Sequence, residues 1–489
     1  MGLISPQLKN PPKYLLASIL CSANGLLFGM DTGIIGPVTD MKDFKAEFGG
    51  SENATIHGLI VSSILIPAAL SSFFAGHVAD RLGRPKGICI GTFIFGLGAA
   101  IEAGAIHIAM FVVGRLIEGV GEGLFLGNLV VLICEISPTK TRGTLTTGPQ
   151  LACTLGLVVG YFVSYGTSSI QSSLSWRTPW IVLSACAIII CGISLAFLPE
   201  SPQWLGLHGR YQEAEEAWEN LGVPLADREP VKAEVQVQEV ESDTEEEEFN
   251  PGPKKKTAGA VLDIFSRDVR GRTALGVFLM GMQQWSGIDG VLYYAPQLFQ
   301  KAGLASSEAS FLASGVSALV IFAVTIPGLI YADSWGRRSS VILGGIGMGI
   351  LMFTMGGLYA GDAVTGAGRW IVIICIYLFA ALYSATWGIT VKVYSAEIQP
   401  QCTRAAATTL AHSSNWVCNF TVALITPVLL AKSNFGVYIL FGGCCVITVI
   451  VSILFMHETQ GKSFKKIEES FKGSSVKGNR LWRRTAGKV

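Results

Sequence analysis

The chain has 489 residues, of which 50% are hydrophobic and only 15% are charged. A soluble protein carries about 25% charged residues, so this composition is typical of a protein with many membrane spans. The formal net charge is +1, which gives no electrostatic reason to expect a nucleic-acid partner.

Twelve apolar runs follow one another along the chain, each of a length that can cross a bilayer core about 30 Å thick. The first run starts near Tyr14 and has neither the short apolar core nor the cleavage site of a signal peptide. The predicted spans lie roughly at 14–36, 55–79, 87–107, 109–134, 144–166 and 176–198, and then at 272–299, 309–332, 340–361, 369–395, 404–430 and 434–456.

Basic residues are concentrated in the loops after spans 2, 4 and 8, and they are scarce in the loops after spans 3, 5 and 9. The positive-inside rule then places both termini in the cytoplasm of a multi-pass cell-membrane protein. The sequon at Asn53 falls in an outward loop, where glycosylation is expected, whereas a second sequon at Asn419 lies inside a span. The predicted segments are a cytoplasmic N-terminus (1–13), a first bundle (14–198), a cytoplasmic linker with short amphipathic helices (199–271), a second bundle (272–457) and a cytoplasmic tail (458–489).

The two halves of the chain repeat. The charged stretch 80–84 after span 2 has a counterpart at 333–338 after span 8. A glutamate and an arginine seven residues apart also occur in both halves, at Glu135 and Arg142 and again at Glu397 and Arg404. Parallel repeats of six spans that meet at a central site are a known plan of transporters.

A polar cluster interrupts span 7. The stretch 283–290 reads Gln-Gln-Trp-Ser-Gly-Ile-Asp-Gly, and Tyr293 and Tyr294 follow it. Amides and carboxylates at membrane depth usually face a cavity or a partner, so the cluster indicates a ligand path.

Together with the stretches at 80–84, 114–115, 199–202 and 333–338, this cluster resembles the motifs of sugar porters of the major facilitator superfamily, in the same order and over roughly residues 14–465. The resemblance implies an all-α membrane protein with the major facilitator fold, with twelve transmembrane helices in two six-helix halves that rock about a central site. Two motifs depart from the family pattern, with Gln203 in place of an arginine and residues 457–461 in place of Pro-Glu-Thr-Lys-Gly.

Gln283 and Gln284 offer both hydrogen-bond donors and acceptors, which suits the hydroxyl groups of a sugar. Gly287 and Gly290 allow the helix to loosen so that neighbouring side chains converge on a ligand. The alternative is that both glutamines serve only to hydrogen-bond neighbouring helices. By resemblance, the other substrate-binding candidates are Gln150, Tyr293, Asn415 and Asn419.

Three positions break the neutral-sugar pattern. Asp289 stands where the family usually has Asn, Lys392 where it has a sugar-stacking Trp, and Ile321 where it has Asn. An unpaired lysine at the centre of a span costs about 2.5–3.5 kcal/mol, so a partner is expected. Lys392 either holds a substrate carboxylate such as that of a uronate, forms a structural ion pair with Asp289, or faces water.

Asp31 in span 1 and Arg115 in span 4 match the proton-coupling pair of the family's symporters. A carboxylate that alternates between an arginine and a proton couples proton entry to a conformational change; the alternative is a permanent structural bridge. Glu118 and Glu122 share one helix stripe with Arg115. They either act as additional proton sites or offset its charge.

By the same resemblance, charges at the cytoplasmic ends of the spans form a latch that closes the inner gate, although they also serve as topology signals. The predicted gating residues are Asp80, Arg84, Glu135, Arg142, Asp333, Arg337, Arg338, Glu397 and Arg404.

The sequence therefore predicts a monomeric transporter in the lipid bilayer that takes up a monosaccharide or a sugar acid together with protons. It predicts no enzyme and no cofactor, because the chain has no P-loop, nucleophile elbow or metal cluster. One alternative is a non-transporting sugar sensor, which the short tail after the last span disfavours. The others are an efflux antiporter and a neutral-hexose porter in which Asp289 and Lys392 form a structural pair.

Overall fold

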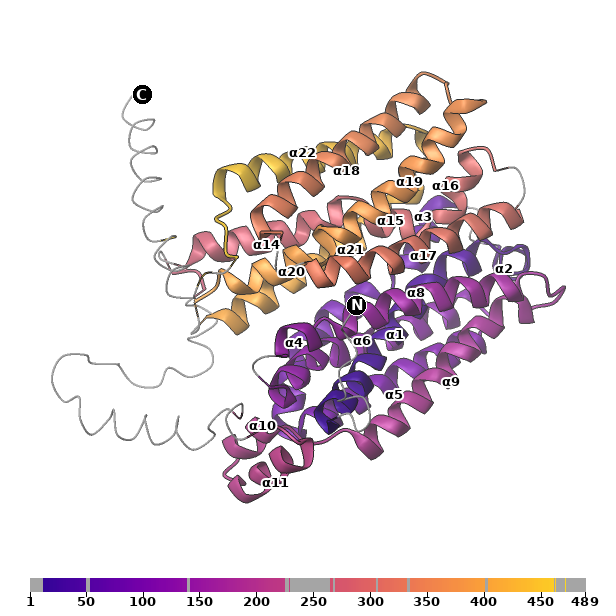
Figure 1. The fold of residues 1–489 in the computed structure, drawn as a ribbon. Helices are drawn as coiled ribbons and strands as arrows, with labels where there is room; N and C mark the ends of the chain where they lie inside the picture. Colours follow the sequence, from indigo (N-terminus) through magenta and orange to yellow (C-terminus); the bar gives the residue numbers. More distant parts are fainter. Residues whose placement is uncertain are drawn as a thin grey trace, which may run out of the picture. The chain divides into compact units, whose positions relative to one another are not determined.

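The protein is described by a computed structural model that covers residues 12–49, 53–138, 141–224, 228, 264–266, 269–304, 307–331, 335–400, 403–460, 462 and 471. Within these ranges the regular secondary structure is helical, without a strand. The helices form two compact units, and Figure 1 labels them along the chain.

The first unit contains eleven helices of the N-terminal half, most of α16 (Ala295–Lys301) and the first part of α17 (Ser307–Tyr331). The eleven are α1 (Lys13–Asp40), α2 (Lys42–Phe48), α3 (Ala54–Ser62), α4 (Leu65–Leu82), α5 (Arg84–Ala103), α6 (Ile108–Ile136), α7 (Arg142–Leu145), α8 (Gly148–Thr167), α9 (Leu174–Phe197), α10 (Pro202–Leu207) and α11 (Tyr211–Leu221).

The second unit contains the rest of α17, six further complete helices and the first part of α15, inside which the boundary along the chain falls. The helices are α14 (Arg270–Trp285), α15 (Ile288–Tyr293), α18 (Arg337–Ala360), α19 (Ala367–Ala385), α20 (Trp387–Glu397), α21 (Arg404–Lys432) and α22 (Gly436–Phe455).

Eleven stretches of the described residues are helical, long and apolar enough to cross a membrane. They match every predicted span except the seventh, 272–299. That segment is divided into α14, α15 and α16, each too short to cross a bilayer by itself. The seventh span is thus a broken helix, and the expectation that glycine loosens it is confirmed at Gly287.

The break in the seventh segment is set by Gly287. Its φ of +91° lies in a region that costs other L-residues roughly 1–2 kcal/mol. A Cβ added at this position would also lie 2.2 Å from the ring of Phe441 on α22. Glycine is thus required both by the backbone and by the packing, and Gln283 and Gln284 end up in the last turn of α14, just before the break.

Glycines also bring helices of the first unit into close contact. On α1, Gly25, Gly29 and Gly33 recur every fourth residue, and a Cβ on each would collide with the backbone of α8 at 1.8–2.5 Å. Small residues at this spacing allow helix backbones to approach closely in a membrane. The same device joins α5 to α6, where a Cβ on Gly121 would lie 2.3 Å from the backbone of Phe95.

A second break separates α19 from α20 in the second unit. The chain turns at Thr386 (φ −121°, ψ −78°), and α20 begins with the fully buried Trp387. The indole Nε1 of Trp387 donates a hydrogen bond to the carbonyl oxygen of Val341 on α18 at 2.9 Å. The break therefore positions α20, which carries Lys392, against α18.

Two short helices follow α9. The short amphipathic helices predicted for the linker 199–271 include α11, whose Ala214 packs with Trp204 and Leu205 of α10 in a small apolar cluster. Figure 1 shows α10 and α11 side by side at the end of the first unit's long helices.

Candidate functional site

The amide of Gln283 joins three helices of the second unit. Its Nε2 donates a hydrogen bond to the carbonyl oxygen of Trp387 on α20 at 2.7 Å. Its Oε1 accepts one from Asn415 on α21 at 3.1 Å, and the same Asn415 amide donates to the carbonyl oxygen of Met280 at 2.9 Å. Gln283 is fully buried, so its observed role is to hold α14, α20 and α21 together.

Gln284 is oriented by the same asparagine. Its Nε2 donates to Asn415 Oδ1 at 3.1 Å, and its side chain also hydrogen-bonds the carboxylate of Asp289 on α15. Its own Oε1 is buried and accepts no hydrogen bond from any described residue. Gln284 therefore carries an acceptor that a hydroxyl group could satisfy.

Asp289 and Lys392 form the charged part of this network. Asp289 is half-buried at the start of α15, whereas the side chain of Lys392 on α20 is exposed. The positive charge of Lys392 acts on the carboxylate of Asp289 and on the ring of His412 on α21. The second unit thus brings together two amides, a carboxylate and an ammonium group on α14, α15 and α20.

The three remaining predicted substrate residues lie on α21, α8 and α15. Asn419 is one helical turn beyond Asn415 on α21; it is buried, and its Oδ1 accepts no hydrogen bond from the described residues. Gln150 is half-buried near the start of α8, and Tyr293 is buried at the end of α15. Both belong to the first unit.

The predicted pair of Asp31 and Arg115 is in contact in the first unit. Nη1 of Arg115 donates to Asp31 Oδ1 and also to Glu118 Oε2 at 3.1 Å. The guanidinium lies 5.6 Å from the ring centre of Trp180, in the range of a cation–π interaction. The exposed fraction of Arg115 is 1% and that of Asp31 is 3%, so this ion pair is shielded from water.

A further acidic residue, which the sequence reasoning missed, adjoins this pair. Oε2 of Glu102 on α5 lies 3.9 Å from Nη1 of Arg115, and Glu102, Glu118 and Glu122 are all 0% exposed. Glu102 lies near the end of an apolar run. Because ionisable residues inside a span are rare, this position is the signal that could have identified it.

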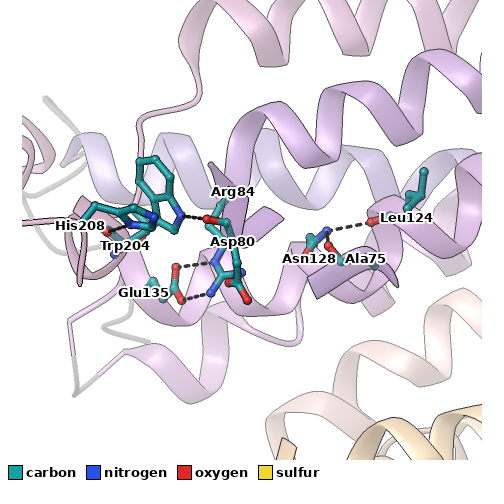
Figure 2. Close-up of polar contacts among 9 residues, drawn as sticks. Ala75, Asp80, Arg84, Leu124, Asn128, Glu135, Trp204 and His208 are labelled. Atoms are coloured by element: carbon teal, nitrogen blue, oxygen red, sulfur yellow. Dashed lines mark hydrogen bonds and ion pairs between the residues drawn. The ribbon is translucent and has the colours of Figure 1, made fainter. Parts of the chain in front are cut away.

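Predicted gating residues of the first half form one network, which Figure 2 shows. Arg84 lies between two carboxylates, 2.7 Å from Asp80 and 3.2 Å from Glu135. The indole Nε1 of Trp204 on α10 donates to the backbone oxygen of Asp80 at 2.9 Å. The ends of α4, α5, α6 and α10 are thereby tied together. Arg142, at the start of α7, is half-buried.

The second half has a corresponding network. Arg337 and Glu397 form an ion pair at 3.2 Å, and Glu458 accepts hydrogen bonds from the backbone N–H groups of Arg337 (2.7 Å) and Arg338 (3.1 Å). Glu458 therefore caps α18 where the helix dipole favours negative charge. Arg404 donates to the carbonyl oxygen of Gln399 at 3.3 Å. Asp333 lies outside the described residues.

Backbone contacts govern the ionisation of Glu458. Burial acts to raise its pKa, but hydrogen bonds from the backbone N–H groups of Gln460, Arg337, Arg338 and Thr459 outweigh burial and hold the pKa below the usual value.

The sequon asparagine Asn53 is exposed and caps α3, where its side chain accepts a hydrogen bond from Thr55 N at 3.0 Å.

Comparison with known proteins agrees with this arrangement. Residues 17–471 match the profile of the family described as "Sugar (and other) transporter". The high glucose sensor RGT2 of Saccharomyces cerevisiae is 31% identical over 94% of this chain, and the match spans 60% of the sensor's own length. The high-affinity glucose transporter of Kluyveromyces lactis is 28% identical over 93% of this chain and 84% of its own length.

The fold has solved counterparts. The inward-open xylose transporter XylE of Escherichia coli superposes with a TM-score of 0.74 at 24% identity, covering 93% of this chain and 99% of XylE. The proton:xylose symporter XylE bound to 6-bromo-6-deoxy-D-glucose gives a TM-score of 0.74 at 25% identity, over 94% and 99% of the two chains. The relatives are transporters or sensors rather than enzymes. The chain is a multi-pass membrane protein that belongs to the sugar porter family of the major facilitator superfamily.

Proposed function

We propose that this protein is a secondary active transporter that takes up a monosaccharide or a sugar acid together with protons by alternating access. The observation that carries the proposal is the polar network of the second unit, in which Gln283, Gln284 and Asn415 are tied to the charged Asp289. Buried amides that orient one another present hydrogen-bonding groups at fixed positions, as recognition of sugar hydroxyls requires.

The proposal that the substrate is acidic is based on Lys392. Its ammonium group is exposed on α20, while its charge acts on Asp289, which is itself bonded to Gln284. An exposed lysine close to hydroxyl-binding amides suits a sugar with a carboxylate, because a charge-assisted hydrogen bond is stronger than a neutral one. The alternative is that Asp289 and Lys392 serve each other, in which case the substrate is a neutral hexose.

Proton coupling rests on Asp31 and Arg115. The pair is shielded from water, so protonation of Asp31 removes a buried ionic contact and changes the preferred packing of α1 against α6. The proton:xylose symporter XylE shares this fold, which supports coupling in this chain.

A sugar sensor is the second candidate, because the match to RGT2 extends over 94% of this chain. A sensor would bind sugar without moving it. Solute exchange in proteoliposomes separates the two, since only a transporter carries labelled sugar across the bilayer when unlabelled sugar is inside.

For the topology we propose that both termini are cytoplasmic and that Asn53 is glycosylated on the outer face of the cell membrane. The exposed Asn53 at the start of α3 supports this orientation. Loss of an endoglycosidase-sensitive mobility shift in Asn53→Gln, with an unchanged shift in Asn419→Gln, is the expected result. An unmodified wild-type chain from a eukaryotic host would contradict it.

The deciding experiment is uptake of labelled galacturonate and labelled glucose, side by side at pH 5 and pH 7, in cells that lack their own sugar transporters. Galacturonate uptake that exceeds glucose uptake and falls with a protonophore would support the acid and the coupling together. Glucose uptake alone would make Asp289 and Lys392 a structural pair. Binding of either sugar without uptake would favour the sensor.

A further inference from the structure

Three carboxyl groups from three helices compete for one nitrogen of Arg115. Asp31 of α1 accepts a hydrogen bond from Nη1, Glu118 of α6 accepts another at 3.1 Å, and Glu102 of α5 lies 3.9 Å away. Glu122, one turn beyond Glu118, adds a fourth buried carboxyl whose charge interacts with Asp31 and Arg115. Four carboxylates and one guanidinium would leave three negative charges uncompensated.

Oε2 of Glu118 and Oε2 of Glu102 lie 3.1 Å and 3.9 Å from the same nitrogen of Arg115, and the two carboxyl groups interact with each other. Both carboxyl oxygens of Glu102 lack a hydrogen bond from any N–H or O–H group of the described residues. The same holds for Oε1 of Glu118. Ionised carboxyl groups only accept hydrogen bonds. The contact between them therefore lacks a donor unless one of the two carries a proton.

The glycines of α5 and α6 hold the two carboxyls together. A Cβ on Gly98 would lie 2.5 Å from the backbone nitrogen of Glu118, and a Cβ on Gly114 would lie 2.5 Å from Cγ of Glu102. Each glutamate thus packs over a glycine of the opposite helix. This packing keeps the two side chains next to each other at the contact between α5 and α6.

The surroundings offer little other charge compensation. Beside this stretch of α6, α4 presents Ala68 and Ser71, α9 presents Trp180, and the backbone oxygen of Val61 accepts a long bond (3.5 Å) from Arg115. Among the described residues, no group of three or more His, Cys, Asp or Glu has the arrangement of a metal site. Two carboxyls so close in a medium of low dielectric constant cannot both be ionised, and the ligand that fits them is a proton.

We propose that Glu102 and Glu118 form a second proton-binding site, in which the two carboxyls share one proton and Glu118 serves as an alternate counter-ion of Arg115. The consequence for transport rests on the proposed proton coupling through Asp31, whereas the shared proton itself does not.

The shared proton moves when Asp31 changes state. While Asp31 is ionised and pairs with Arg115, the proton resides on Glu118. When Asp31 is protonated, the O–H bond of Glu118 breaks, an O–H bond forms on Glu102, and the Glu118 carboxylate pairs with Arg115. One proton is transferred and the number of protons on the glutamate pair is unchanged. Arg115 thus keeps a counter-ion throughout, which lowers the cost of protonating Asp31.

Infrared spectroscopy of the purified full chain in lipid nanodiscs tests the site without transport. We expect Glu102→Gln and Glu118→Gln each to remove the same carbonyl band of a protonated carboxylic acid, and Glu122→Gln to retain it. The inference is overturned if both variants keep the band or if each removes a different one. Should one variant fail to fold, the other still decides, because each alone must abolish the shared proton.

The pH dependence of uptake in proteoliposomes tests the consequence. Glu118→Gln removes the alternate counter-ion, so the pH of half-maximal uptake should fall by about one unit, a tenfold change in proton concentration. Glu102→Gln leaves Glu118 ionised and hydrogen-bonded by the new amide, which eases protonation of Asp31 and should raise that pH. Glu122→Gln should shift it less than either of these variants, because neither carboxyl oxygen of Glu122 accepts a hydrogen bond from Arg115 or any other described residue. If Glu118→Gln and Glu102→Gln shift this pH in the same direction, the role of Glu118 as an alternate counter-ion is overturned.

Wild-type uptake that does not change with pH or with a protonophore would refute the proposed proton coupling. The infrared result would still decide whether the two carboxyls share a proton.

Discussion

Replacing Lys392 by glutamine tests whether the lysine binds a substrate carboxylate or forms a structural ion pair with Asp289. Lys392 is exposed, so its charge acts in a medium with an effective dielectric constant of about 20, where an opposite charge at 4 Å contributes roughly 4 kcal/mol. Removing water from both groups offsets part of this, and a hydrogen bond to a charged group contributes about 1.5–3 kcal/mol net. Because 1.4 kcal/mol corresponds to a tenfold change, Lys392→Gln should weaken galacturonate binding roughly 10- to 150-fold.

The assay is competition by galacturonate and by glucose for uptake of one labelled substrate in proteoliposomes. The ratio of the two inhibition constants removes effects of expression and folding, which act equally on both sugars. Glucose binding should change little in Lys392→Gln, because a neutral hexose gains no charge-assisted bond from the ammonium group. Lys392→Trp should weaken galacturonate binding in the same way and favour glucose, since a tryptophan offers a stacking surface.

Asp289→Asn is the matched variant with the opposite sign. The carboxylate of Asp289 repels a substrate carboxylate, so its removal should tighten galacturonate binding several-fold. The asparagine still offers Gln284 a side chain with which it can form a hydrogen bond. An unchanged galacturonate-to-glucose ratio in Lys392→Gln would refute the carboxylate clamp. Equal losses for both sugars in both variants would instead identify a structural ion pair.

Three further predictions concern coupling, packing and pH. Asp31→Asn should abolish accumulation against a gradient but spare exchange, because Arg115 keeps Glu118 at 3.1 Å; continued accumulation would remove Asp31 from coupling. Gly287→Ala should lower the free energy of unfolding by roughly 2–5 kcal/mol, from the strained φ and the collision with Phe441. Thermal unfolding measures this against Gly443→Ala, where a Cβ meets nothing within 4 Å, and an equal effect of both would contradict it. The low pKa of Glu458 means that its stabilising contribution is present above about pH 4.3 and disappears as the pH falls through its lower folded value. Glu458→Gln should therefore lower the unfolding temperature at pH 7 and have little effect near pH 3; a loss of equal size at both would assign the stabilisation to packing alone.

The sequence was sufficient to predict the spans because a run of about 20 apolar residues has few other stable forms. The exact break in the seventh span could not be predicted, for a local reason. Gly287 marked a place where the helix could loosen, but an actual break depends on φ and on the ring of Phe441, which comes from more than 150 residues away along the chain. Such a contact leaves no periodic signal in the sequence.

The candidate sites were predictable as residue types and less so as contacts. The helical stripe of Arg115, Glu118 and Glu122 could be seen because all three lie on α6. Glu102 is on α5, and only the glycine contacts between α5 and α6 bring its carboxyl to Glu118. The role of Gln283 likewise depends on Trp387 and Asn415, which lie on two other helices.

The two units differ in how they accommodate buried polar groups, and the difference bears on function. In the second unit the amides of Gln283 and Asn415 satisfy one another, so this part of the network stays intact as the pH changes. In the first unit Arg115 is outnumbered by carboxyls, so its contacts depend on where protons reside. Under the proposed function, a change in proton concentration would therefore act first on the packing of α1, α5 and α6 and leave the amides of Gln283 and Asn415 in place. That separation is what a proton-driven porter requires, since its driving ion must alter conformation while the substrate site keeps its specificity.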